Sequence, residues 1–127
     1  MVQYDLRLTE GFGVLHNSTG WRVATHCYQE NVNGIEALKE WGIHEDSEEA
    51  FMLLEGEGVL AVMEDGQLQI NRLLPCRLYV VAAKEKHALV LKAETKVLIM
   101  ENRDMSRFET EKMRAQDLEK IRTAAGF

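Results

Sequence analysis

The chain has 127 residues, which is enough for one domain with a single hydrophobic core. It carries 15 Lys and Arg residues against 21 Asp and Glu residues, for a formal net charge of −6, and has no block of basic residues. This balance argues against nucleic acid as a partner. No apolar run approaches the roughly 20 residues that span a bilayer, and the start of the chain has neither a basic stretch nor an apolar signal core. We therefore expect a cytoplasmic protein without membrane contacts.

Two strands are predicted in the first part of the chain. Phe12–Leu15 is a short apolar patch that favours an edge strand. The alternation in Trp21–Gln29 indicates a longer strand, and its core face is expected to hold Trp21, Val23, Thr25 and Cys27. His26 belongs to the opposite face, so its side chain is expected to point away from the interior. Gly34–Ile43 is expected to form a loop or an irregular strand.

A hairpin in the middle of the chain is the clearest element. Glu49–Glu55 alternates between two largely apolar faces, which predicts a strand in the wall of a sandwich or barrel. Gly56 then breaks the run and indicates a bulge or bend. Asp65-Gly66 is typical of a type I′ turn, so Val59–Met63 is expected to pair with Gln67–Leu73 in antiparallel fashion.

Three further strands are expected before residue 104. Leu73–Val81 reads as a strand that is broken at Pro75, a residue suited to a strand start or edge. His87–Leu91 and Lys96–Glu101 alternate or are apolar throughout, as strands are. In total about eight short strands with frequent turns indicate an all-β sandwich or jelly roll.

The last part of the chain predicts a helix. Ser106 and Glu109 fit a capping box, which places the start of the helix at about residue 106 or 107. Met113, Leu118, Ile121 and Ala125 can share one helix face, which predicts an amphipathic helix over about residues 107–124. Nothing separates this amphipathic helix from the strands, so residues 1–127 are expected to form one domain.

Several residues resemble the motifs of the cupin superfamily. His44, Glu49 and Gly56 match the second histidine, the glutamate and the glycine of the first cupin motif, and His87 stands where the second motif has its histidine. Gly42 replaces the first histidine, while the proline, glycine and asparagine of the second motif are replaced by Ala82, Lys84 and Leu91. The resemblance implies a cupin-type jelly roll, or double-stranded β-helix, over about residues 20–104, followed by the helix at about 106–124.

The resemblance also implies a site inside the barrel. His44, Glu49 and His87 would be the ligands of one divalent transition metal, such as Zn, Fe, Mn or Ni. With the faces of strand 21–29 inverted, His26 becomes a fourth possible ligand. Without a metal, Glu49 and His87 would bind a small polar molecule directly, or would only hydrogen-bond to each other. The apolar wall of this ligand site is predicted to consist of Phe51, Leu53, Tyr79 and Leu89.

The sequence leaves several functions open. One is a small-molecule-binding cupin of undefined activity, with the ligand held by Glu49, His87 and His44. An alternative is a metal-dependent enzyme of the isomerase or dioxygenase type that acts on a sugar or a small organic acid. Glu49 and His87 could also form a metal-free acid–base pair, or the domain could serve only for interaction. Cupins are commonly dimeric, and unpaired strand edges with a spare helix make a homodimer the expected assembly.

Overall fold

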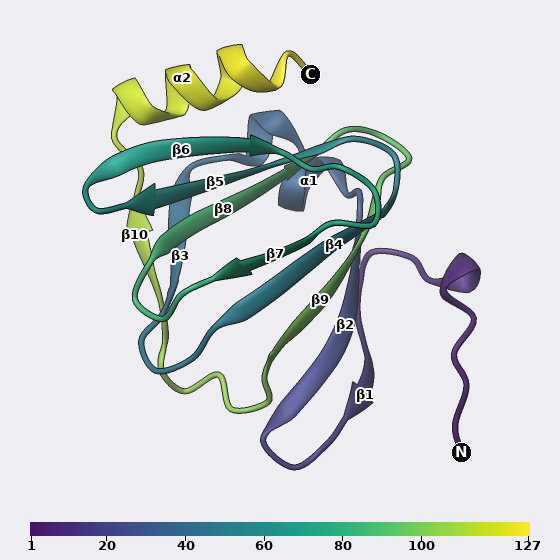
Figure 1. The fold of residues 1–127 in the computed structure, drawn as a ribbon. Coiled ribbons are helices and arrows are strands. Elements are labelled where there is room, and N and C mark those ends of the chain that lie inside the picture. Colours follow the sequence, from purple (N-terminus) through teal and green to yellow (C-terminus); the bar gives the residue numbers. More distant parts are fainter.

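The computed structural model describes all residues, 1–127, and contains two antiparallel sheets that face each other. The first sheet has the order β1-β2-β9-β4-β7 and the second has the order β10-β3-β8-β5-β6 (Figure 1). The strands of the first sheet are β1 (Phe12–Asn17), β2 (Trp21–Cys27), β9 (Lys96–Asn102), β4 (Glu49–Glu55) and β7 (Leu78–Val81). Those of the second are β10 (Phe108–Lys112), β3 (Glu40–His44), β8 (Lys86–Leu91), β5 (Gly58–Glu64) and β6 (Gln67–Arg72). The predicted all-β jelly roll is confirmed.

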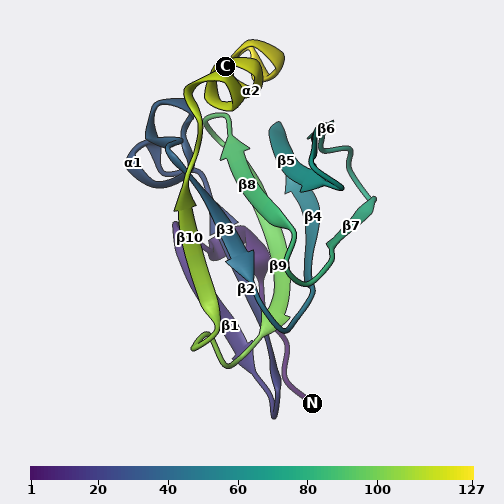
Figure 2. The same cartoon turned by 90° about the vertical axis from the view of Figure 1, so that its left-hand side faces the viewer.

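Helical structure is confined to short segments outside the sheets. The four-residue helix α1 (Glu30–Asn33) and a 3₁₀ turn (Ile35–Ala37) lead into β3, and another 3₁₀ turn (Leu6–Leu8) lies in the N-terminal arm. Figure 2 shows α1 beside the upper end of β3 and β10. The longest helix, α2 (Ala115–Ala125), packs on β5 and β6, and no helix of the protein could span a bilayer.

Apolar side chains form two cores, one on each side of the second sheet. The core between the sheets consists of Phe51, Leu53, Leu60, Val62, Leu73, Val81, Leu91, Val97 and Ile99. The core beneath α2 consists of Leu38, Trp41, Ala61, Ala88, Val90, Met113 and Ile121. Because successive side chains of a strand alternate in direction, Leu60 and Val62 of β5 enter the first core and Ala61 enters the second. Burial on both faces fixes the register of β5 and of its neighbour β8.

The predicted turns of the central hairpin are present. Glu64 pairs with Gln67, and Asp65 and Gly66 both have positive φ, at 50° and 75°, as a type I′ turn requires. Gly56 has a φ of 88° and lies between β4 and β5, where the chain changes from one sheet to the other. This change of sheet is the bend that the glycine predicted.

The C-terminal helix begins later than predicted. Residues 108–112 form strand β10, which pairs with β3 in antiparallel fashion, and α2 starts only at Ala115. Ser106 does not cap a helix, because the residues that follow it form β10, and its backbone N–H donates to the side chain of Asp104. All five residues of β10 are exposed, so this edge strand lacks the apolar alternation that would have predicted it. The chain therefore has ten strands rather than about eight.

Two other segments differ from the prediction. Gly34–Ile43 is neither loop nor irregular strand alone, since it begins with a 3₁₀ turn and ends in the regular strand β3. Of Leu73–Val81, only β7 (Leu78–Val81) is a strand, and Pro75 forms one isolated bridge with Leu53. Proline has no N–H to donate, so an isolated bridge is the pairing available to it.

Strand β2 has the opposite orientation to the one expected. Its residues Arg22 and His26 line the cavity between the sheets, whereas Trp21 and Val23 line a separate apolar hollow on the outer face. N-terminal residues, including Val2, Tyr4 and Leu6, form the other side of that hollow. The N-terminal arm lies beside the outer face of β2, although Trp21 remains 49% exposed there, so apolar character alone did not mark the barrel interior.

Candidate metal and ligand site

Three buried polar side chains from opposing sheets meet between them. His44 ends β3 and His87 lies in β8, next to it in the second sheet, while Glu49 begins β4 in the first sheet. Their exposed fractions are 5%, 7% and 7%. The backbone N–H of Lys84 donates to the carbonyl oxygen of His44 at 2.7 Å, which ties the end of β3 to the turn before β8. The Ala82 N–H, which donates to the Glu85 side chain at 2.8 Å, holds the same turn.

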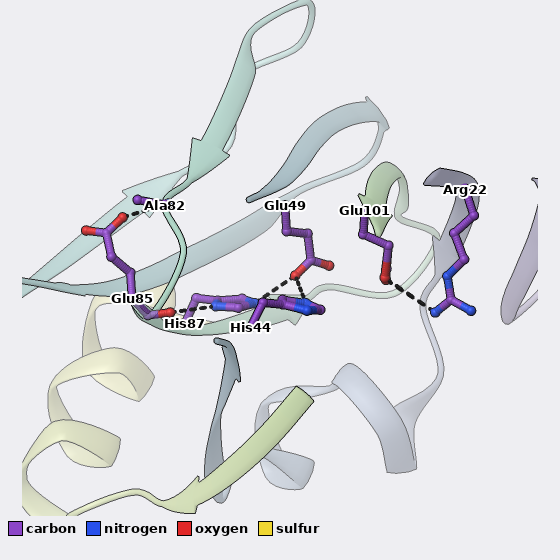
Figure 3. Close-up of polar contacts among 7 residues, drawn as sticks. All are labelled: Arg22, His44, Glu49, Ala82, Glu85, His87 and Glu101. Carbon is purple, nitrogen blue, oxygen red and sulfur yellow. Dashed lines mark hydrogen bonds and ion pairs between the residues drawn. The ribbon is translucent and has the colours of Figure 1, made fainter. Parts of the chain in front are cut away.

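Both imidazoles contact the same carboxylate oxygen. Nε2 of His44 lies 2.9 Å from Oε2 of Glu49, and Nε2 of His87 lies 2.8 Å from the same atom. The two rings are stacked, with centroids 5.6 Å apart and planes 14° apart. Figure 3 shows both rings beneath the Glu49 carboxylate. One potential ligand atom from each residue therefore lies within 4.8 Å of the others.

The electrostatics of this cluster favour a charged Glu49. Burial alone would raise the pKa of Glu49, but the hydrogen bonds and the positive charge of His44 and His87 outweigh it and lower the pKa to about 2. Burial would likewise lower the pKa of His87, yet its hydrogen bond to Glu49 and the charge of Glu49 raise it. The carboxylate is ionised at neutral pH, and His87 takes up a proton more readily than a free histidine.

The ring orientation of His87 suits a metal ligand. Its Nδ1 lies 3.1 Å from the carbonyl oxygen of Glu85, a group that can only accept, so Nδ1 carries the proton. In the neutral ring, Nε2 then has a lone pair directed at the Glu49 carboxylate, which also only accepts. Either a second proton or a cation has to satisfy both atoms. Two imidazoles and one carboxylate are a ligand set that Zn, Fe, Mn and Ni accept, so the residues fit a divalent transition metal.

A cavity of 590 Å³ adjoins the cluster. Of the predicted wall residues, Phe51 and Leu89 line it, but Leu53 and Tyr79 do not. Leu53 is 3% exposed and packs in the core between the sheets. The hydroxyl of Tyr79 accepts from the N–H of Leu74 at 3.0 Å instead of facing the cavity. The ligand wall predicted from the sequence thus splits between the cavity and the core.

The cavity also contains polar residues that sequence reasoning missed. Arg22 of β2 stands opposite Glu101 of β9 in the sheet register, and both line the cavity. Nη2 of Arg22 lies 3.4 Å from each carboxylate oxygen of Glu101. Burial, and then the charge of Glu49, raise the pKa of Glu101, while Arg22 opposes this shift. The only sequence signal was that Arg22 and His26 are four residues apart on one strand and so share a face.

The backbone is similar to those of solved cupin structures. A cupin-2 domain protein from Shewanella frigidimarina is 24% identical with a TM-score of 0.57, covering 76% of this chain and 86% of that one. An RmlC-like cupin from Desulfovibrio desulfuricans is 19% identical with a TM-score of 0.55, covering 80% and 96%. KdgF from a Halomonas species is 13% identical with a TM-score of 0.55, covering 75% and 79%. No protein-family model matches the sequence, nor does any curated protein.

The chain has the cupin fold. Matched cupin structures include enzymes, among them an oxalate oxidase at 18% identity and a salicylate 1,2-dioxygenase from Pseudoaminobacter salicylatoxidans at 15%. Their TM-scores are 0.50 and 0.52, and the match covers 68% and 73% of this chain but only 43% and 25% of theirs. At these identities the likeness extends to the fold and not to the activity.

The sequence departs from the first cupin motif at Gly42. A Cβ atom at this position would lie 3.1 Å from the ring of Phe108, a residue of β10. The same ring packs on His44, with centroids 4.9 Å apart. The aromatic side chain of Phe108 therefore fills space beside the position from which the absent histidine would project. Lys84, in place of the glycine of the second motif, keeps the backbone shape of that motif with a φ of 71°.

His26 lines the cavity but does not join the cluster of His44, Glu49 and His87. Its ring packs edge-on against Phe12, with centroids 5.3 Å apart and planes at 80°. Burial lowers the pKa of His26, while the charge of Glu49 partly opposes this shift. The orientation of β2 brings His26 to the same cavity as the cluster. The group of potential ligand atoms that lie within 4.8 Å of one another nevertheless consists of His44, Glu49 and His87, so the structure does not support His26 as a fourth metal ligand.

Proposed function

We propose that the protein binds a small polar molecule in the cavity between its sheets, and that His44, Glu49 and His87 hold one divalent transition metal there. The observation that carries this proposal is the convergence of three buried ligand atoms, from two sheets, at the wall of a 590 Å³ cavity. Such cavities commonly bury small ligands around a few placed polar groups. When bound, a metal of this kind supplies a Lewis acid that polarises a ligand oxygen.

Each residue of the cluster has a defined part in this proposal. Glu49 supplies the negative charge that offsets a divalent ion, and its low pKa keeps that charge available well below neutral pH. His87 supplies Nε2, because its Nδ1 is engaged by the Glu85 carbonyl. His44 supplies its own Nε2 from the neighbouring strand. The Glu85 carbonyl would fix the orientation of the His87 ring without itself binding the metal. Hydrogen-bond partners of metal-binding histidines commonly have this effect.

Metal analysis tests this proposal. Protein purified without chelator, and protein reconstituted with Zn, Fe, Mn or Ni, is expected to hold about one metal ion per chain. His87→Ala is expected to reduce the metal content at least about tenfold, since it removes one of three ligands. His16→Ala is the matched control, because His16 lies in the outer hollow and bonds to Tyr4. No uptake after reconstitution, or unchanged uptake in His87→Ala, would overturn the metal proposal.

The second candidate function is a metal-dependent enzyme of the dioxygenase or isomerase type, acting on a small organic acid or a sugar. It is favoured by the enzymes among the matched cupin structures and by the ionisable Glu101 in the cavity. Oxygen consumption by the reconstituted protein with salicylate or oxalate tests for oxygen-dependent turnover. Proton NMR of separate mixtures detects ring cleavage of salicylate, or isomerisation of a sugar such as glucose. Turnover that disappears in His87→Ala and persists in His16→Ala supports an enzyme.

A further inference from the structure

The cavity has a second group of polar residues, separate from the metal cluster. Arg22 and His26 lie on the same face of β2, and Glu101 lies opposite Arg22 on β9. Figure 3 shows Glu101 between Glu49 and Arg22, so the polar residues form a row across the first sheet. The proposed metal site would lie at one end of this row and the guanidinium of Arg22 at the other.

Hydrogen bonding leaves donors of this group without protein partners. Arg22 contacts Glu101 only through Nη2, at the long distance of 3.4 Å, and its Nε is buried with no acceptor. Nε2 of His26 is also buried with no partner. An arginine only donates and is always charged, and buried donors of this kind are normally paired. An acceptor with negative charge is the group that best matches Arg22.

Phe12 holds the two side chains at one end of the cavity. The Cζ atom of Arg22 lies 5.7 Å from the centroid of the Phe12 ring, and the His26 ring packs on the same ring at 5.3 Å. Phe12 is 45% exposed and lines the cavity, which places this end next to solvent. A ligand entering here meets Arg22 and His26 together. Contact with the same aromatic ring restricts the conformations of both side chains, so less side-chain entropy is lost when a ligand binds.

We propose that Arg22 and His26 form a carboxylate subsite, and that the ligand of the cavity is a small hydroxy acid. Its carboxylate would bind Arg22 and His26, and its hydroxyl oxygen would face His44, Glu49 and His87. This inference rests on the proposed function and chooses an acid over a neutral sugar. The Arg22–Glu101 pair is neutral, and a divalent ion held by Glu49 and two neutral histidines leaves one positive charge. One carboxylate balances it, whereas a sugar leaves it uncompensated in a buried site.

Titration calorimetry on the Zn-loaded protein tests this inference with 2-hydroxybutyrate and butane-1,2-diol as probes. Both probes have four carbons and a hydroxyl group on the second carbon, but only 2-hydroxybutyrate has a carboxylate. 2-Hydroxybutyrate is expected to bind at least about tenfold more tightly than butane-1,2-diol, and Arg22→Gln is expected to weaken 2-hydroxybutyrate binding about 10- to 100-fold. Arg77→Gln is the matched control, since Arg77 is exposed and lies outside the cavity. Arg22→Lys keeps the charge but not the planar donor pair and is expected to lose less.

The outcomes separate this inference from the metal proposal. Arg22→Gln should keep its bound zinc and its wild-type melting temperature within a few degrees, so that weaker binding of 2-hydroxybutyrate reports the subsite alone. His26→Phe, which keeps the packing on Phe12, should weaken 2-hydroxybutyrate binding by a smaller factor. 2-Hydroxybutyrate binding that depends on Arg22 in a protein unable to hold zinc would support the subsite and refute the metal. Equal binding of 2-hydroxybutyrate by wild type and Arg22→Gln, tighter binding of butane-1,2-diol, or binding of neither probe would overturn the carboxylate subsite.

Discussion

Replacing Glu49 by glutamine in the metal-free protein tests the electrostatics of the cluster. Glutamine has the shape of a protonated glutamate, so the variant lacks the charge that His44 and His87 stabilise. The fall of the Glu49 pKa from 4.5 to about 2 corresponds to about 3 kcal/mol of stability at neutral pH. Because the pKa of Glu49 is lower in the folded than in the unfolded protein, this stability is present above pH 4.5 and is lost as the pH falls to about 2. The two proteins should therefore converge in stability in acid.

Urea unfolding followed by circular dichroism, at several pH values between about 5 and 3, measures this difference. The stability advantage of wild type over Glu49→Gln should shrink by about 1 kcal/mol per pH unit in this range. Glu101→Gln is an informative control because the pKa of Glu101 is raised, so ionisation of this carboxyl costs stability as the pH rises. In measurements extended from pH 4.5 up to about 7, the stability difference between wild type and Glu101→Gln should change in the opposite direction. A Glu49→Gln difference that stays constant with pH would refute the reasoning.

His87 sets the other limit of this pH range. Its raised pKa means that the stability gained from its protonation is present below pH 6.5 and is lost as the pH rises through its folded value. Protonated His87 and ionised Glu49 form the same interaction, so the two contributions overlap rather than add. The metal-free cluster should accordingly stabilise the fold most between pH 4.5 and 6.5. Metal binding should shift the optimum upward, since a metal takes the place of the proton on Nε2.

Three further predictions concern packing and assembly. Gly56→Ala should cost more than about 2 kcal/mol in urea unfolding, because a Cβ there would lie 2.3 Å from Oγ1 of Thr95, whereas Gly66→Ala meets open space and should cost only about 1 kcal/mol for its positive φ. Ile121→Ala should cost about 2 to 5 kcal/mol because Ile121 is fully buried beneath α2, and the exposed Lys120→Ala should be nearly neutral in the same assay. Size-exclusion chromatography with light scattering should give the mass of a homodimer, and a strict monomer at high concentration would contradict this expectation.

The spacing of the motif residues allowed the cluster of His44, Glu49 and His87 to be predicted from the sequence. His44 and Glu49 are five residues apart, across the connection from β3 to β4, and this short connection keeps their side chains near each other. His87 joined them through the cupin resemblance, and the structure brings the three together in one cluster. The alternation of β4 also identified Phe51 as a residue facing inward.

The remaining features depend on contacts that are distant in sequence. Strand β2 turns Trp21 and Val23 towards the N-terminal arm, and it turns Arg22 and His26 towards the cavity. The strand Phe108–Lys112 is exposed throughout and is held by pairing with β3, so no local pattern predicts it. A sequence reading that relies on local periodicity places apolar residues inside, and it fails where a second layer of chain covers the outer face.

The ring of Phe108 beside Gly42 couples two positions that are far apart in the chain. Substituting histidine for Gly42 alone would bring its Cβ to 3.1 Å from that ring, so the bulk of the new side chain would compete with the aromatic group for the same volume. A third imidazole at this position therefore requires the ring of Phe108, which is 39% exposed, to move by a small distance or to be replaced by a smaller side chain. The number of imidazoles that this site can hold is thus linked to the side chain on an edge strand that follows it by more than 60 residues in the chain, because Phe108 of β10 lies beside Gly42 of β3.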